Sequence, residues 1–250
     1  RCALVTGVQT CALPICSRSP ETILQYARQD IAFLLSKDVK CIMAACGTVS
    51  STYPAAEAEK LPVPYLGVVD AAAREAAFAT RNRRIGIIGT AATIRSRSYE
   101  TLLRKLVPGV EITARACPLF VPLVEAGYVD HSDPEKQQVT RLVIAQYLAG
   151  IRDAGVDTLI LGCTHYPLLR SLLRKVVGEK VTLVNPAYET SQALCRLLRE
   201  LDLENPGNDE LGRQKYQFFA SDGVERFNAF AHSVLPEPIS DTRQIQIENY

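Results

Sequence analysis

Residues 157–167 read DTLILGCTHYP, an apolar strand pattern that ends in Cys163 and a hydroxyl residue and leads into a helix start near Pro167. Residues 39–48, VKCIMAACGT, repeat this order with Cys46. Each cysteine is therefore expected at the carboxyl end of a strand, the edge of an open α/β sheet where ligands bind. A helix N-terminus nearby favours the thiolate over the thiol. Two such cysteines in two similar halves predict one reaction centre flanked by two thiols, as proton removal and return at a single carbon requires.

The composition is typical of an ordinary folded protein and indicates no charged partner. The 250 residues are 47% hydrophobic and 22% charged, with a formal net charge of +1, so the chain can bury one large core or two modest ones. Because no basic patch is interleaved with aromatic residues, neither nucleic acid nor a membrane surface is expected as a partner. No apolar run approaches the roughly 18 residues of a membrane span, and no signal peptide is visible. The sequence therefore predicts a cytoplasmic protein.

The cysteines and histidines favour neither disulfides nor a metal site. The eight cysteines contain no C-x-x-C pair, and several lie in apolar strand patterns, so reduced thiols are expected. Among the three histidines, His165 is too close in sequence to Cys163 for both to bind one tetrahedral ion easily. We expect no metal.

The first 16 residues, RCALVTGVQTCALPIC, differ from the rest of the chain. They contain three of the eight cysteines and no acidic residue, and they begin without methionine. A clear helix start follows, with Ser19 as N-cap and Pro20 at the first helical position. We expect residues 1–16 to be non-native sequence joined to a truncated gene and to pack poorly. The alternative is an unusual native strand with a turn at Gly7.

From residue 19 onward, apolar patterns of strand and helix periodicity alternate, which predicts an α/β fold with parallel-type sheets. Strands are expected at residues 39–45, 65–69, 84–88, 110–114, 157–161 and 181–184. Helices are expected at residues 19–36, 54–60, 70–80 with Asp70 as N-cap, 98–106, 139–154 and 188–201. A last strand and helix are expected between residues 218 and 234, and Ile245 and Ile247 could form a short edge strand.

Five segments match the motifs of a known family. They are residues 17–23 (SRSPETI), 45–48 (ACGT), 87–94 (IIGTAATI), 116–125 (ACPLFVPLVE) and 161–168 (LGCTHYPL). Through them, residues 17–234 resemble the glutamate racemases of the aspartate/glutamate racemase family. The resemblance implies a cofactor-independent isomerase that interconverts L- and D-glutamate and supplies D-glutamate for peptidoglycan. Its small-molecule substrate would be glutamate, and a homodimer is compatible with it.

The resemblance also implies two pseudo-symmetric α/β domains with the active site in the cleft between them. Residues 17–70 and 186–250 would form the first domain, on the side of Cys46. Residues 71–185 would form the second domain, on the side of Cys163.

The same resemblance assigns roles in the site. Cys46 and Cys163 would be the two bases, with Cys46 acting on the D-isomer and Cys163 on the L-isomer. His165 would tune the Cys163 thiol or protonate the carbanion, and Glu125 would support it with charge. The residues expected to bind substrate are Gly47, Thr48, Thr90, Thr93 and Thr164. Taken alone, the cysteines could be buried strand-end residues, and any one of these threonines could be a helix N-cap.

Three departures from the family pattern limit this interpretation. The family opens with a strand that ends in Asp-Ser-Gly, which this chain lacks, and it carries Pro-Tyr-Gly where this chain has Pro14-Ile15-Cys16. Gly47 replaces an asparagine that helps to hold the substrate. These departures leave open an alternative, a racemase-fold binding protein with impaired or no catalysis. An enzyme for aspartate or a hydantoin is a weaker alternative.

Overall fold

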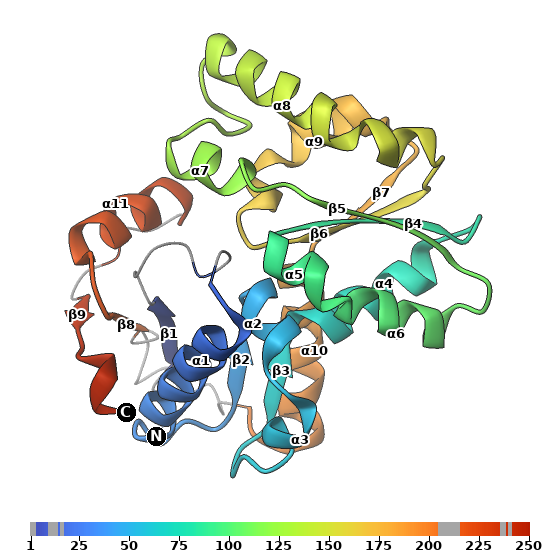
Figure 1. The fold of residues 1–250 in the computed structure, drawn as a ribbon. Coiled ribbons are helices and arrows are strands. Elements are labelled where there is room, and N and C mark those ends of the chain that lie inside the picture. Colours follow the sequence, from blue (N-terminus) through green and yellow to red (C-terminus); the bar gives the residue numbers. More distant parts are fainter. Residues whose placement is uncertain (1–3, 10–14, 16–17, 205–215, 236–238, 240–241) are drawn as a thin grey trace. The chain divides into compact units, whose positions relative to one another are not determined.

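The computed structural model describes residues 4–9, 15, 18–204, 216–235, 239 and 242–250, and Figure 1 shows its helices and strands. The chain forms two compact units. One comprises the described residues of Arg1–Ile42, Tyr53–Tyr65 and Arg196–Tyr250, and the other comprises Met43–Thr52 and Leu66–Cys195. Both units contain parallel strands and helices, so the predicted α/β class with parallel sheets is confirmed.

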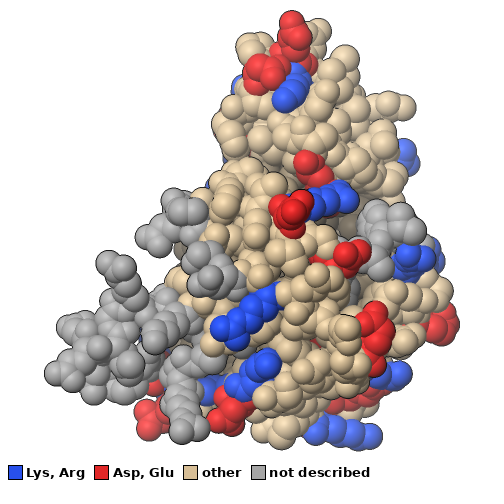
Figure 2. All heavy atoms as spheres, turned by 90° about the vertical axis from the view of Figure 1, so that its left-hand side faces the viewer, with Lys and Arg blue, Asp and Glu red and all other residues tan. Residues whose placement is uncertain are grey.

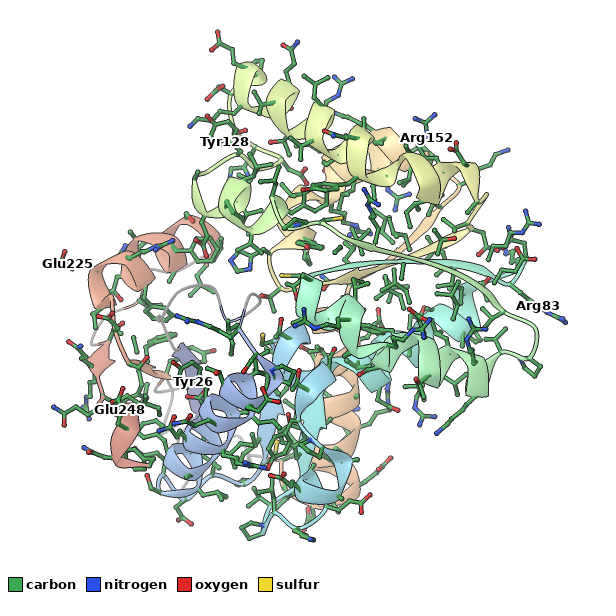
Figure 3. The ribbon with its side chains drawn as sticks, in the orientation of Figure 1. Tyr26, Arg83, Tyr128, Arg152, Glu225 and Glu248 are labelled. Carbon is green, nitrogen blue, oxygen red and sulfur yellow. The ribbon has the colours of Figure 1, made fainter. Side chains whose placement is uncertain are left out.

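The second unit is built on a four-stranded parallel sheet with the order β5-β4-β6-β7. The strands are β4 (Arg84–Gly89), β5 (Glu111–Ala116), β6 (Thr158–Gly162) and β7 (Thr182–Val184). Gly89 pairs with both Ala116 and Gly162, so β4, β5 and β6 end at one edge of the sheet. Arg83, which precedes β4, lies at the opposite end of this sheet (Figure 3). Residues that directly follow β4, β5 and β6 therefore meet at one edge, where α/β proteins bind ligands.

Helices cover both faces of this sheet, which explains why β4 and β6 are apolar without alternation. On one face lie α4 (Val68–Ala79) and α6 (Ser98–Leu106), and on the other lie α8 (Pro134–Asp153) and α9 (Arg170–Val177) (Figure 1). Ala72, Ala73 and Ala76 of α4 are fully buried in the core formed with Ile85, Ile87, Tyr99, Leu103 and Ile160. These small side chains let α4 pack closely against the sheet.

Shorter elements of this unit surround the carboxyl edge of the sheet. They are α2 (Gly47–Thr52), α5 (Ala91–Ser96), α7 (Phe120–Glu125), a 3₁₀ helix at Tyr166–Leu169 and the beginning of α10 (Pro186–Glu200). Strands β2 (Ile42–Ala44) and β3 (Tyr65–Gly67) form a separate two-stranded sheet. On the face drawn in Figure 2, basic and acidic side chains are interspersed.

The first unit contains a three-stranded parallel sheet with the order β1-β8-β9. Its elements are β1 (Leu4–Gln9), α1 (Pro20–Leu35), α3 (Ala55–Ala58), β8 (Tyr216–Ala220), α11 (Val224–Val234), β9 (Arg243–Gln244) and a 3₁₀ helix at Ile247–Asn249. Phe33 and Phe219 are the largest members of its core, and their rings meet edge to face with centroids 4.9 Å apart. The helix predicted from Ser19 is confirmed, because the Ser19 hydroxyl accepts a hydrogen bond from the Thr22 N–H at 3.3 Å.

Three predicted helix starts were wrong. The helix expected from residue 188 begins at Pro186, as α10. The helix expected at residues 70–80 begins at Val68, and Asp70 is not its N-cap but pairs with Arg74 at 2.6 Å. The cause is a cap from another segment, since the Ser50 hydroxyl accepts a hydrogen bond from the Val68 N–H at 3.1 Å. The helix expected from residue 139 begins at Pro134, where the Asp133 carboxylate accepts a hydrogen bond from the Lys136 N–H.

The chain ends also differ from the predictions. The backbone of Leu4–Gln9 forms β1, an edge strand paired with β8, while poor packing of residues 1–16 stays a prediction. Gly7 lies within β1 rather than in a turn, and the pairing register shifts between Val5 and Val8. The other residues of 1–16, Ile15 excepted, lie outside the described part of the chain, and the non-native origin stays a prediction. The short edge strand near the C-terminus lies at Arg243–Gln244, and Ile247 belongs to a 3₁₀ helix instead.

The compact units divide the chain at different residues from the predicted domains. The segment Met43–Thr52, which carries Cys46, packs in the same unit as Cys163. The predicted first domain instead included Cys46 with residues 17–70. The division into domains at residues 70 and 186 therefore stays a prediction, while the two cysteines can be described within one unit.

Candidate active site

Cys163 directly follows β6 at the carboxyl edge of the sheet. It is 9% exposed, and its backbone N–H donates to the Leu161 carbonyl at 2.8 Å. Its own carbonyl accepts a hydrogen bond from the Tyr166 N–H at 3.1 Å, which begins the 3₁₀ helix at Tyr166–Leu169. Backbone hydrogen bonds of both its N–H and its carbonyl therefore fix the direction in which the Cys163 side chain points away from the backbone.

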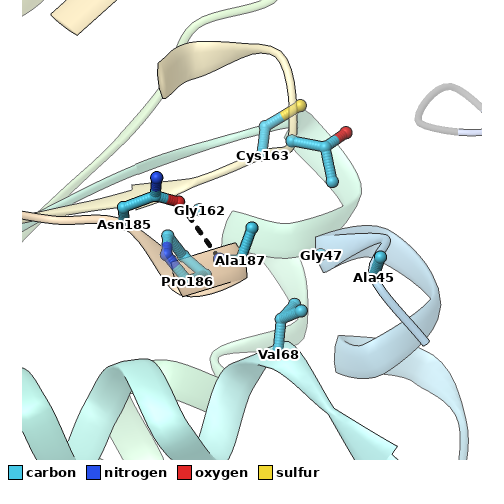
Figure 4. Close-up of a pocket in the computed structure, with 9 residues that line it drawn as sticks. Ala45, Gly47, Val68, Gly162, Cys163, Asn185, Pro186 and Ala187 are labelled. Atoms are coloured by element: carbon cyan, nitrogen blue, oxygen red, sulfur yellow. Dashed lines mark hydrogen bonds between the residues drawn. The ribbon is translucent and has the colours of Figure 1, made fainter. Parts of the chain in front are cut away.

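The segment that carries Cys46 lies against the end of β6. A Cβ atom built on Gly47 would collide with the carbonyl oxygen of Gly162, a backbone atom that cannot swing aside. Ala45 and Gly47, on either side of Cys46, line the same pocket as Gly162 and Cys163 (Figure 4). The close approach of two glycines thus brings the backbone of both cysteine segments to one pocket.

Three buried threonine hydroxyls connect α2 to α5. The Thr48 and Thr90 hydroxyl oxygens are 2.9 Å apart, and the Thr90 hydroxyl donates to that of Thr93 at 3.0 Å. None of the three residues is more than 5% exposed. Thr90 is also the N-cap of α5, since its hydroxyl accepts a hydrogen bond from the Thr93 N–H. The structure therefore brings these predicted substrate-binding residues together as a connection between two helices, and their binding of substrate stays a prediction.

Cys163, His165 and Glu125 form a line of three ionisable groups. The Cys163 sulfur lies 3.8 Å from Nδ1 of His165, and Nε2 of the same ring lies 3.4 Å from a carboxylate oxygen of Glu125 at the end of α7. The Thr164 hydroxyl is 3.4 Å from the same Nδ1. Because a carboxylate only accepts hydrogen bonds, Nε2 is the nitrogen that carries the proton in neutral His165. Nδ1 then presents a lone pair to the Cys163 thiol.

Burial keeps this histidine neutral. It lowers the pKa of His165 below its ordinary value of 6.5, and this effect outweighs the Glu125 carboxylate, which acts to raise the pKa. The two influences oppose each other, so the close ion pair does not by itself indicate a charged ring. A neutral imidazole with an accepting Nδ1 can take a proton from the Cys163 thiol and return it.

One further polar residue, Asn185, lines the pocket and was not predicted from the sequence. It follows β7, and its side-chain oxygen accepts a hydrogen bond from the Ala187 N–H at 3.1 Å, which caps α10 (Figure 4). An asparagine followed by proline after a strand is the signal that could have identified it. The pocket itself holds about 10 Å³, near the space of one water molecule, so it can take a small group of a ligand.

Within the described ranges, no cluster of three or more His, Cys, Asp or Glu side chains could hold a metal ion. No helix there is long and apolar enough to span a membrane.

Comparison with known proteins places the chain among racemases. The profile of the Asp/Glu/Hydantoin racemase family matches residues 10–194. The glutamate racemase of Geobacter metallireducens is 38% identical over 96% of this chain and 85% of its own length. The family profile matches from residue 10 onward, whereas the resemblance was predicted to begin at residue 17.

Solved structures agree with this relationship. The glutamate racemase of Thermus thermophilus, solved in complex with β-chloro-D-alanine, matches with a TM-score of 0.83 and 34% identity over 97% of this chain and 86% of that chain. The glutamate racemase of Francisella tularensis, solved in complex with D-glutamate, matches with a TM-score of 0.83 and 28% identity over 96% and 86% of the two chains.

Replacing Gly47 with alanine tests the close approach of the two segments. The added methyl group would overlap the Gly162 carbonyl, so Gly47→Ala should lower the free energy of unfolding by about 1–3 kcal/mol, measured by urea denaturation. Gly150→Ala is the control, because nothing lies within 4 Å of a Cβ atom at this position in α8, and alanine there should be neutral or stabilising. Equal stability of Gly47→Ala and the wild type would show that α2 does not pack on β6 in this way.

The buried neutral His165 predicts a loss of stability in mild acid. On unfolding, the ring regains its ordinary pKa of 6.5, so below that pH the unfolded state binds more protons than the folded state. The contribution of His165 is therefore complete above about pH 6.5 and decreases as the pH falls toward the lowered pKa of the folded state. Urea unfolding between about pH 5 and pH 8 should give a flatter profile for His165→Gln than for the wild type.

The exposed His131 provides the control for this profile. His131→Gln should keep the acid-side loss of stability, because it leaves His165 in place. If His165→Gln and the wild type lose stability in parallel, His165 is not the buried neutral group described above.

Proposed function

Because the chain belongs to the Asp/Glu/Hydantoin racemase family, we propose that it interconverts L- and D-glutamate without a cofactor. The relatives compared above are glutamate racemases, and the enzyme of Francisella tularensis was solved with D-glutamate bound, which supports glutamate as the substrate. The observation that carries the proposal is the contact of Gly47 with Gly162, because it brings the segment of Cys46 to the pocket lined by Cys163.

The reaction needs two bases because the α-proton leaves from one face of the carbon and returns to the other. Starting from L-glutamate, the Cys163 thiolate takes the α-proton as the Cα–H bond breaks, and the electron pair delocalises into the carboxylate. The Cys46 thiol then donates its proton to the opposite face, which forms D-glutamate and leaves Cys46 as the thiolate. The reverse reaction, or proton exchange with solvent, restores the starting state.

His165 and Glu125 prepare Cys163 for this role. Nδ1 of His165 accepts the thiol proton, and Glu125 holds the tautomer that makes this possible. Thr48, Thr90, Thr93 and Thr164 supply hydroxyl groups for the substrate carboxylates, together with backbone N–H groups near Gly47. Cys163 is buried and His165 is partly buried, which limits the water that would otherwise solvate the thiolate and weaken it as a base.

In the cell, we infer that the D-glutamate formed serves peptidoglycan synthesis and so cell-wall biogenesis and cell shape. The resemblance of the motifs supports this role, and a cytoplasmic location and a homodimer are compatible with it.

A second candidate is a racemase-fold protein that binds a small molecule without turning it over. The observation that favours it is the absence of Asp-Ser-Gly anywhere in the sequence, together with glycine at position 47. Such a protein would lack a carboxylate to assist Cys46, and it would bind glutamate without exchanging its α-proton.

Replacing the Cys163 thiol separates the two candidates. Cys163→Ser retains nearly the same volume, but its hydroxyl is a far weaker acid, so racemisation of glutamate in either direction should fall by about 10²–10⁴-fold. Rates are measured by polarimetry or by chiral chromatography of the two isomers. A folded Cys163→Ser protein that keeps its turnover would show that the thiol is structural, and a wild type with no turnover would favour the second candidate.

Cys117 offers a matched control at the same sheet edge. It follows β5 as Cys163 follows β6, but it is fully buried, and its thiol donates to the Arg115 carbonyl at 3.7 Å. Burial raises the pKa of Cys117 to about 12, so this thiol stays protonated. Cys117→Ser should therefore retain glutamate turnover within about threefold of the wild type.

A further inference from the structure

Ser50, in the middle of α2, contacts the chain on both sides of Cys46. Its backbone N–H donates to the carbonyl of Cys46 at 2.9 Å, and its hydroxyl donates to the carbonyl of Ala44 at 2.8 Å. One residue therefore holds Cys46 itself and the residue two positions before it. These two bonds close a ring around the backbone of residues 44–46 and so restrict the direction in which the Cys46 side chain leaves it.

The same hydroxyl also connects this ring to α4. It accepts a hydrogen bond from the N–H of Val68, the first residue of α4, at 3.1 Å. Gly67, the N-cap residue, has no side chain to make this bond, and a Cβ atom there would lie 3.2 Å from both Cβ and Oγ of Ser50. Ser50 therefore packs closely against Gly67, and a side chain at position 67 would crowd it.

A hydroxyl is the group that can make both bonds at once. It has one proton to donate and lone pairs to accept, whereas an alanine at this position would leave the Ala44 carbonyl and the Val68 N–H without these bonds. Val68 lines the pocket, and Ala44 directly precedes Ala45, which lines it as well. Loss of the hydroxyl would therefore release the Cys46 segment at the pocket wall rather than at a distant surface.

We propose that Ser50 is a positioning residue for Cys46, whose hydroxyl sets the direction of the Cys46 thiol by fixing Ala44 to the start of α4. This inference rests on the proposed racemase function, in which Cys46 must face one side of the substrate carbon. Proton transfer depends steeply on geometry, and a misplacement of about 1 Å can cost about 10²-fold in rate. Ser50 itself does not touch the substrate in this account.

The test compares Ser50→Ala, Ser50→Thr and Ser98→Ala. Ser98→Ala is the control, because the Ser98 hydroxyl also bonds to α2, at the carbonyl of Ser51 at 2.9 Å, but does not contact residues 44–46. For each protein, the measurements are the midpoint of thermal unfolding, kcat and KM for glutamate, and the alkylation rates of Cys46 and Cys163. Alkylation with iodoacetamide, followed by peptide mass spectrometry, reports on each thiol and does not require turnover.

We expect Ser50→Ala to reduce kcat at least tenfold with KM within about threefold of the wild type. The alkylation rate of Cys46 should change at least threefold, while that of Cys163 stays within twofold. Ser50→Thr keeps the hydroxyl and should restore both quantities to within about threefold of the wild type. Ser98→Ala should lower the unfolding midpoint and leave kcat and both alkylation rates near wild-type values.

Two results would overturn the inference. The first is a Ser50→Ala protein whose unfolding midpoint falls as in Ser98→Ala but whose kcat and Cys46 alkylation rate do not change, because Ser50 would then only stabilise the fold. The second is an equal change at Cys46 and Cys163, which would indicate general loosening. If the wild type does not turn glutamate over, the proposed function fails, and a selective change of Cys46 alkylation would still support the positioning role.

Discussion

The contact of Gly47 with the carbonyl of Gly162 is the constraint on which the rest of the site depends. The two residues belong to segments far apart in sequence, and they can meet because Gly47 presents no Cβ atom to the Gly162 carbonyl. Gly162 is enclosed on its other side as well, since a Cβ atom there would lie 2.7 Å from the Ile88 carbonyl oxygen and 3.3 Å from the Tyr99 ring. A larger residue at position 47 would separate the two cysteine segments, and a larger residue at position 162 would collide with β4 and with Tyr99 of α6. The threonine hydroxyls of α2 and α5 and the bonds of Ser50 then hold α2 in this place.

Location at the carboxyl edge of the sheet does not by itself make a cysteine reactive. Cys117 and Cys163 directly follow β5 and β6 of the same sheet, yet they differ in what faces their sulfur atoms. Burial raises the pKa of Cys117 to about 12, whereas Cys163 faces an imidazole nitrogen that contacts a carboxylate. The fold supplies a common edge, and the partner of each thiol decides whether it can act as a base.

The sequence predicts those parts of the structure whose causes are local. Strands β4 and β6 are apolar on both faces because helices cover both, so their runs of isoleucine, leucine and glycine were recognised, and Ser19 was identified as an N-cap because its hydroxyl caps its own helix. The start of α4 was missed because its cap comes from Ser50, 18 residues earlier in the chain. The motif around Cys163 identified His165, and the motif at residues 116–125 identified Glu125. The structure brings these two residues together with Cys163. Ser50 and Asn185 were not predicted, since their roles arise from contacts between segments that no local pattern encodes.

In the proposed reaction two groups on opposite faces of the substrate carbon exchange protons with it, and the fate of solvent deuterium shows whether they do. L-glutamate is incubated with the protein in D₂O, and the deuterium content at Cα of both isomers is measured by mass spectrometry during the first few per cent of conversion. We expect deuterium in the D-glutamate formed and protium in the remaining L-glutamate, because the thiol that donates has exchanged with solvent and is not the one that removed the proton. D-glutamate that retains protium, equal labelling of both isomers from the outset, or no labelling of either would contradict it.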